Sequence, residues 1–105
     1  MSDFDLEICY LSATEALKKF KSKTLSPVEL LSEIKKRTED VNPKINAFNF
    51  YRFDESFKEA KEAEERYSQN KETLPLEGIP LAIKDEVNIK GQPNKNGSLI
   101  FKDYI

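Results

Sequence analysis

Ser26 and Pro27 form the strongest helix start signal in the sequence, and this signal most constrains how the chain folds. Serine is a favoured N-cap because its hydroxyl accepts a hydrogen bond from an otherwise unpaired backbone N–H, and proline is favoured at the first helical position. Glu29 lies three residues after the serine, as in a capping box. Apolar side chains then recur near helical spacing as far as Pro43, which disfavours helical geometry in the residue before it. The sequence therefore predicts a helix over 27–40.

A second helix start signal lies upstream. Ser12 and Glu15 have the spacing of a capping box, in which the serine hydroxyl and the glutamate carboxylate each accept from the other residue's backbone N–H. Lysines crowd the end of the segment that follows, where positive charge is favourable beside the helix dipole. We therefore expect a helix over 13–22 that pairs with the next helix, antiparallel or at an angle, across a short connection.

Two further stretches have the character of strands. Residues 45–53 are rich in aromatic side chains, which favour strands. Asp54 then predicts the start of a third helix, which runs to about Tyr67. Residues 79–85 are a short apolar run that ends in Lys84-Asp85, and its length and β-branching favour a buried strand. The expected fold class is therefore α/β.

Composition excludes several kinds of chemistry. The 105 residues include no His and one Cys, so the chain cannot assemble a His-dependent nucleophile, form an internal disulfide or readily bind zinc. Lys and Arg total 17 against 19 Asp and Glu, which gives no basic surface for nucleic acid. No apolar run approaches the length of about 20 residues that spans a bilayer. The acidic first ten residues are unlike a secretory signal. We expect a cytoplasmic protein without cofactor or metal that does not enter a membrane.

Lys84 is the main candidate for chemistry, because it ends an apolar run and is followed by Asp85 and Glu86. A lysine in water has a pKa of about 10.4, so a basic role near neutral pH needs a shift of roughly 3 units, or about 4 kcal/mol. Burial at a strand end that faces a closed pocket can supply this shift. In the alternative interpretation, the side chain extends to solvent or pairs with Asp85.

Other candidate residues have simpler structural interpretations. Ser98 lies in a tail rich in turn residues and lacks the sequence of a nucleophile elbow. Glu62, Glu64 and Glu65 have the spacing of an exposed helix face. Cys9 has no neighbour in the sequence that would lower its pKa, so we expect a small, partly buried side chain.

Residues 76–85, Leu-Glu-Gly-Ile-Pro-Leu-Ala-Ile-Lys-Asp, resemble the strand that bears the catalytic lysine of the amidase signature family. The resemblance runs from about Leu11 to Tyr104, and the block from Gly-Ile-Pro to Lys-Asp is its specific part. It continues in these segments: 11–15, 25–30, 42–43, 45–48, 87–93 and 96–98.

The resemblance implies that residues 1–105 are the N-terminal portion of the amidase signature fold, in which helices surround a mixed sheet. This partial domain would have helices at about 13–67 and the lysine-bearing strand at about 79–85, and would be incomplete as a stand-alone domain. It further implies hydrolysis of carboxamides by a Ser–cis-Ser–Lys triad in which Lys84 takes a proton from the bridging serine. The two serines lie downstream in the family, so we expect the chain to be inactive alone. The implied partner of the full-length enzyme is a small-molecule amide, and no cofactor or metal is required.

Two alternatives stay open. The A subunit of glutamyl-tRNA(Gln) amidotransferase shares the same motif, and this alternative would add tRNA as a partner. A non-catalytic relic or helical interaction module would leave Lys84 exposed and replaceable. Under the amidase interpretation the isolated chain lacks the neighbours of its strand, so we expect exposed apolar surface at Leu81, Ile83, Val87 and Ile89 and low stability.

Overall fold

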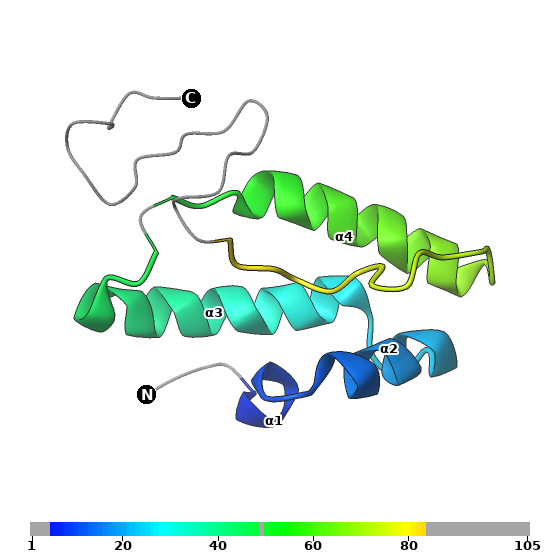
Figure 1. Cartoon of the computed structure of the whole chain (residues 1–105), viewed down its shortest axis with the longest axis horizontal. Coiled ribbons are helices and arrows are strands. Elements are labelled where there is room, and N and C mark those ends of the chain that lie inside the picture. Colours follow the sequence, from blue (N-terminus) through cyan, green and yellow to red (C-terminus); the bar gives the residue numbers. More distant parts are fainter. Residues whose placement is uncertain (1–4, 49, 84–105) are drawn as a thin grey trace.

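The computed structural model describes residues 5–48 and 50–83, which form four helices (Figure 1). The helices are α1 (Leu6–Cys9), α2 (Ala13–Ser22), α3 (Pro27–Ile45) and α4 (Phe53–Ser68). Helices α3 and α4 lie side by side and run in opposite directions, α1 packs on α3, and α2 contacts α4. The residues after α4 turn back and run between α3 and α4 in the view of Figure 1.

The predicted starts of α2 and α3 are confirmed. The Ser12 hydroxyl accepts from the Glu15 N–H at 3.1 Å, and the Glu15 carboxylate accepts from the Ser12 N–H at 3.5 Å, which completes a capping box. The Ser26 hydroxyl accepts from the Glu29 N–H at 3.0 Å, and proline occupies the first helical position of α3. Local hydrogen bonds therefore set both helix starts.

The prediction that Pro43 stops the second of these helices is wrong, because α3 continues to Ile45. Proline lacks an N–H and so removes one hydrogen bond from a helix, and here only two further helical residues follow Pro43. The helix ends at Asn46, which adopts the left-handed conformation (φ 50°, ψ 42°) and donates its N–H to the Asn42 carbonyl at 2.7 Å.

The strand predicted over 45–53 is also wrong. Ile45 belongs to α3, Phe53 belongs to α4, and the described residues between them form an irregular loop. A strand needs a backbone partner for its N–H and C=O groups, and the described ranges offer none here. Asp54 is likewise not the N-cap of α4: the cap is Arg52, which makes no side-chain capping bond, and Asp54 lies in the first turn, where its charge favours the helix dipole.

The core lies where α2, the start of α3 and the end of α4 meet. Its centre is the Phe20 ring, which is 1% exposed and lies 5.4 Å from the Tyr67 ring between centroids. The buried residues of this cluster are Ala16, Phe20, Leu25, Leu30 and Tyr67. Full burial of one such large apolar side chain contributes about 1.5–3 kcal/mol, so this cluster is the main source of stability.

The structure does not show the expected α/β fold class, because residues 5–48 and 50–83 form helices and no sheet. Residues 79–83, the described part of the predicted strand at 79–85, have no strand structure, and Lys84 and Asp85 lie outside the described residues. No other strand lies within the described residues, so the segment has no ladder there in which to pair. None of the helices in the described ranges is long and apolar enough to cross a membrane.

Candidate functional site

The segment that leads to Lys84 is the part of the candidate site that the structure describes. Lys84 and Ser98 themselves lie outside the described residues. After α4 the backbone makes two close turns, in which the Glu77 N–H donates to the Leu74 carbonyl and the Ile79 N–H to the Leu76 carbonyl, both at 3.1 Å. After α4 the chain turns back and runs along the helices (Figure 1).

Gly78 lies against the helices with no room for a side chain. Its φ is +87°, a left-handed conformation that glycine adopts readily and other residues do not. A Cβ at this position would lie 2.7 Å from Cγ of Pro27 and 3.2 Å from Cε2 of Phe20. The glycine of the Gly-Ile-Pro block is therefore required both by its backbone angle and by the approach of the chain to the core.

Glu77 is held through both its backbone and its side chain. The Tyr67 hydroxyl donates to the Glu77 carbonyl at 2.7 Å, and the Arg66 guanidinium donates to the Glu77 carboxylate at 2.7 Å. Burial raises the pKa of Tyr67, and the nearby Glu77 carboxylate acts in the same direction, so the hydroxyl keeps the proton that it donates. Together with the approach of Gly78 to Phe20 and Pro27, these contacts anchor the segment where α2, α3 and α4 meet.

The segment leaves the core soon after this anchor. Ile79 packs against the core cluster, whereas Leu81 is 81% exposed and Ile83 is also exposed. The predicted exposure of apolar side chains is confirmed at Leu81 and Ile83; the other two residues of that prediction, Val87 and Ile89, lie outside the described residues. The anchored backbone therefore presents an uncovered apolar stretch immediately before Lys84.

Sequence reasoning missed the residues that anchor this segment. Arg66 and Tyr67 carry no local sign of binding Glu77, because the pairing depends on how the chain turns after α4. Gly78 is part of the family motif, and a glycine before an apolar run is the one signal from which a close backbone approach could have been inferred.

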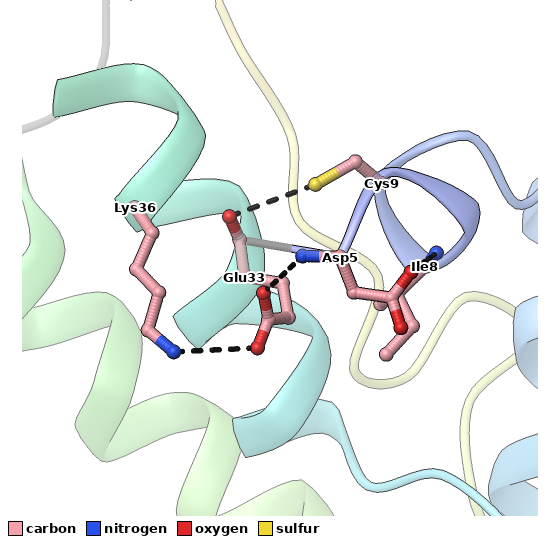
Figure 2. Close-up of polar contacts among 5 residues, drawn as sticks. All are labelled: Asp5, Ile8, Cys9, Glu33 and Lys36. Carbon is pink, nitrogen blue, oxygen red and sulfur yellow. Dashed lines mark hydrogen bonds and ion pairs between the residues drawn. The ribbon is translucent and has the colours of Figure 1, made fainter. Parts of the chain in front are cut away.

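The polar contacts around Cys9 join α1 to α3 and have a structural role. Glu33 of α3 accepts from the Asp5 N–H at 2.7 Å and from the Lys36 ammonium at 3.4 Å, and the Cys9 thiol points at the Glu33 carbonyl, 3.6 Å away (Figure 2). Burial raises the pKa of the Cys9 thiol, and this effect outweighs the nearby Arg37 guanidinium, which acts in the opposite direction. A protonated, partly buried thiol is a poor nucleophile, so the expected structural role of Cys9 agrees with its surroundings.

The acidic cluster of α4 agrees with its expected role as a solvated face. Glu62 and Glu65 are exposed and Glu64 is half-buried. Glu62 approaches Arg66 at 4.0 Å, an exposed ion pair of small energetic value. Across residues 5–48 and 50–83, no group of three or more His, Cys, Asp and Glu side chains is arranged to hold a metal ion.

Comparisons with known proteins agree on one family. The Amidase family profile matches residues 29–105. The A subunit of glutamyl-tRNA(Gln) amidotransferase from Carboxydothermus hydrogenoformans is 36% identical over 100 residues, which cover 95% of this chain and 21% of the relative. The corresponding protein of Fusobacterium nucleatum is 36% identical over 95 residues, covering 90% of this chain and 20% of the relative. Fatty-acid amide hydrolase 2 of Homo sapiens is 30% identical over 102 residues, covering 90% of this chain and 19% of the relative.

No solved structure matches the chain. The chain spans about a fifth of the length of the curated relatives that it matches. The profile match includes the Gly-Ile-Pro block, its anchor at Glu77 and Gly78, and Lys84. On this match and these relatives, the chain belongs to the amidase signature family.

Proposed function

We propose that this chain contributes the lysine-bearing part of an amidase that hydrolyses carbon–nitrogen bonds of carboxamides. The observation that carries the proposal is the anchored segment ahead of Lys84, in which Gly78 lies against the core and Glu77 is bound by Arg66 and Tyr67. A base must be held within hydrogen-bond reach of the proton that it abstracts, and a backbone fixed a few residues upstream limits where the lysine can lie. Family membership supplies the identity of the reaction.

In this proposal Lys84 is uncharged before the reaction and acts as the base of a Ser–cis-Ser–Lys triad. Its amine takes the proton of the bridging serine, which takes the proton of the nucleophilic serine. The nucleophilic oxygen attacks the amide carbon, the C–N bond breaks as the nitrogen gains a proton, and water hydrolyses the resulting ester. Both serines belong to the part of the family domain that this chain does not span, so the chain alone is inactive. Residues 1–105 are then a partial amidase domain, with Lys84 on a strand that pairs in the complete sheet.

A second candidate function is that of a glutamyl-tRNA(Gln) amidotransferase A subunit. The names of the bacterial relatives favour it, whereas the name of the human relative favours hydrolysis of a fatty-acid amide. In the first case the amide is glutamine and the released ammonia passes to a misacylated tRNA. In the second case the substrate is a small-molecule amide and no nucleic acid takes part. A non-catalytic helical module is the remaining alternative, in which Lys84 is replaceable.

The test is to join this chain to the remaining residues of the Carboxydothermus hydrogenoformans relative and to measure ammonia release from glutamine and from a fatty-acid amide. Lys84→Ala should lower turnover by about 10²–10⁴-fold, the usual contribution of a general base. Lys71→Ala, at an exposed lysine after α4, is the matched control and should leave turnover unchanged. Equal turnover of the Lys84→Ala variant and the parent would eliminate the proposed role.

A further inference from the structure

Basic side chains gather on α2 and on the turn that follows it. Residues 16–28 include four lysines and no acidic residue, although Asp and Glu outnumber Lys and Arg by 19 to 17 over the whole chain. All four side chains are exposed, and we call them the lysine cluster: Lys18, Lys19, Lys21 and Lys23. The near balance of charge over the whole chain therefore hides a local excess of positive charge at one edge of the described helices (Figure 1).

The ammonium groups of the lysine cluster are not neutralised by carboxylates of the described residues. Within residues 5–48 and 50–83, the basic side chains that form ion pairs belong to α3, α4 and the cap of α4: Lys35, Lys36, Arg52 and Arg66. Glu15 is the one acidic residue of α2, and its carboxylate accepts from the Ser12 hydroxyl at 2.9 Å. The positive charge of the cluster is therefore available to a binding partner.

The end of α2 does not need these lysines. Basic side chains near a helix end can donate to its last carbonyls, but here backbone groups do so. The Lys19 carbonyl accepts from the Thr24 N–H at 3.0 Å. The Phe20 carbonyl accepts from the Lys23 N–H at 3.2 Å. The helix dipole favours positive charge only in the last turn, and Lys18 lies before it. Lysines three or four positions apart also repel one another, so the cluster holds more positive charge than the helix uses.

The surroundings of the lysine cluster indicate which kind of anion it fits. A helix that binds an anionic membrane also exposes an apolar face that enters the lipid, whereas Leu17 is half-buried and Phe20 is buried. The centres of protein interfaces are rich in aromatic side chains and poor in lysine, but the other exposed side chains of residues 18–24 are the hydroxyls of Ser22 and Thr24. A nucleic-acid backbone needs no apolar contact, because its phosphates attract lysines through charge.

We propose that the lysine cluster binds the phosphate backbone of RNA. Lysine binds phosphate as a compact charge and reads no base, so the cluster holds RNA without selecting its sequence. The choice of RNA rests on the second candidate function, in which tRNA takes part, whereas the fit to a phosphate backbone rests on the described residues.

The test measures the binding of fluorescently labelled tRNA to the 105-residue chain by anisotropy at several salt concentrations. Each contact between a lysine and a phosphate changes the slope of log affinity against log salt by about −0.7 to −0.9, so four contacts predict a slope of about −3. Replacing Lys18 and Lys21 together by Gln should bring the slope to about −1.5 and weaken binding at low salt by about tenfold or more.

The matched control replaces Lys58 and Lys61 of α4 together by Gln. These two lysines are exposed and have the same spacing, but acidic residues flank them in the sequence. Both double variants lose the same charge, so they differ only in where it is lost, and the control should keep the affinity and the slope of the parent. An unchanged helical circular dichroism spectrum shows that each variant is folded.

Three results would overturn the proposal. Equal weakening by the two double variants would assign the binding to the total charge of the chain. A parent chain that does not bind tRNA at low salt would have no RNA surface. Tighter binding to phosphatidylserine vesicles or to polyglutamate than to tRNA at the same salt concentration would assign the lysine cluster to a lipid surface or to an acidic protein.

Lys84→Ala separates this proposal from the proposed function. In the polypeptide joined to the remainder of the Carboxydothermus hydrogenoformans relative, the variant with Gln at positions 18 and 21 should release ammonia from glutamine like the parent. Lys84→Ala in the 105-residue chain should bind tRNA like the parent. Binding that depends on the lysine cluster, together with full turnover of Lys84→Ala, would refute the catalytic role alone. Turnover that depends on Lys84, together with binding that is indifferent to the cluster, would refute the RNA surface alone.

Discussion

The two ends of the helix pair use the same kind of side chain in opposite ways. At one end the Phe20 ring is 1% exposed, covered by Tyr67 and by the backbone at Gly78. At the other end the Phe48 ring is 42% exposed, and a polar residue, Asn42, holds its backbone. The first end is a buried core made of side chains from several segments. The second end is ordered by local hydrogen bonds, and its aromatic side chains stay partly exposed among the residues that the structure describes.

The largest effect expected from this contrast is on stability. Phe20→Ala should lower the free energy of unfolding by about 3–5 kcal/mol, because it leaves a cavity in the core. Phe48→Ala, the matched control, should change it by less than about 0.5 kcal/mol. Denaturant unfolding followed by circular dichroism measures both. Similar losses in the two variants would show that Phe48 contributes to the core after all.

Gly78→Ala should have the next largest effect. The added Cβ meets Pro27 at 2.7 Å in a backbone conformation that alanine rarely adopts, so we expect a loss of about 2–3 kcal/mol in the free energy of unfolding. Leu76→Ala, at an exposed position two residues earlier, is the control and should be nearly neutral. A stable Gly78→Ala variant would mean that the segment is not seated on the core.

Tyr67→Phe should cost about 1 kcal/mol, because it removes the hydrogen bond to the Glu77 carbonyl without changing the packing of the ring. The effect should also depend on pH. The pKa of Tyr67 is raised in the folded state, so its contribution to stability is complete below about pH 10 and falls as pH rises above that value.

Chemical denaturation of parent and variant between neutral pH and about pH 11 measures this dependence. The difference in stability between the two should shrink at the alkaline end. A constant difference would show that the hydroxyl titrates normally and is not buried at the anchor.

Asn42→Ala should have the smallest effect on stability and a clear effect on local order. It removes the side-chain bonds that hold Phe48, so the amide of Phe48 should exchange its hydrogen faster while the amides of the core helices do not change. Gln69→Ala, at the exposed end of α4, is the control. An unchanged exchange rate at Phe48 would show that the loop between α3 and α4 keeps its shape without Asn42.

Local signals predict the helices better than they predict the segments between them. Ser12 and Ser26 cap α2 and α3 as expected, because a cap depends on residues only three positions apart. The aromatic stretch at 45–53 has the composition of a strand, but strand formation depends on a distant partner that no local pattern reveals. Pro43 does not end α3, since the cost of a proline depends on where in the helix it falls.

Short stretches of neighbouring residues were enough to set where α2 and α3 begin and to place the Gly-Ile-Pro to Lys-Asp block in the amidase signature family. Other features arose only when the helices packed: Gly78 lies on Phe20 and Pro27, and the aromatic side chains of one end stay partly exposed among the described residues. The hydrogen bonds that Tyr67 and Arg66 donate to Glu77 also form only in the packed structure. These contacts join separate segments of the chain, so their energies depend on the packed arrangement and not on local propensity.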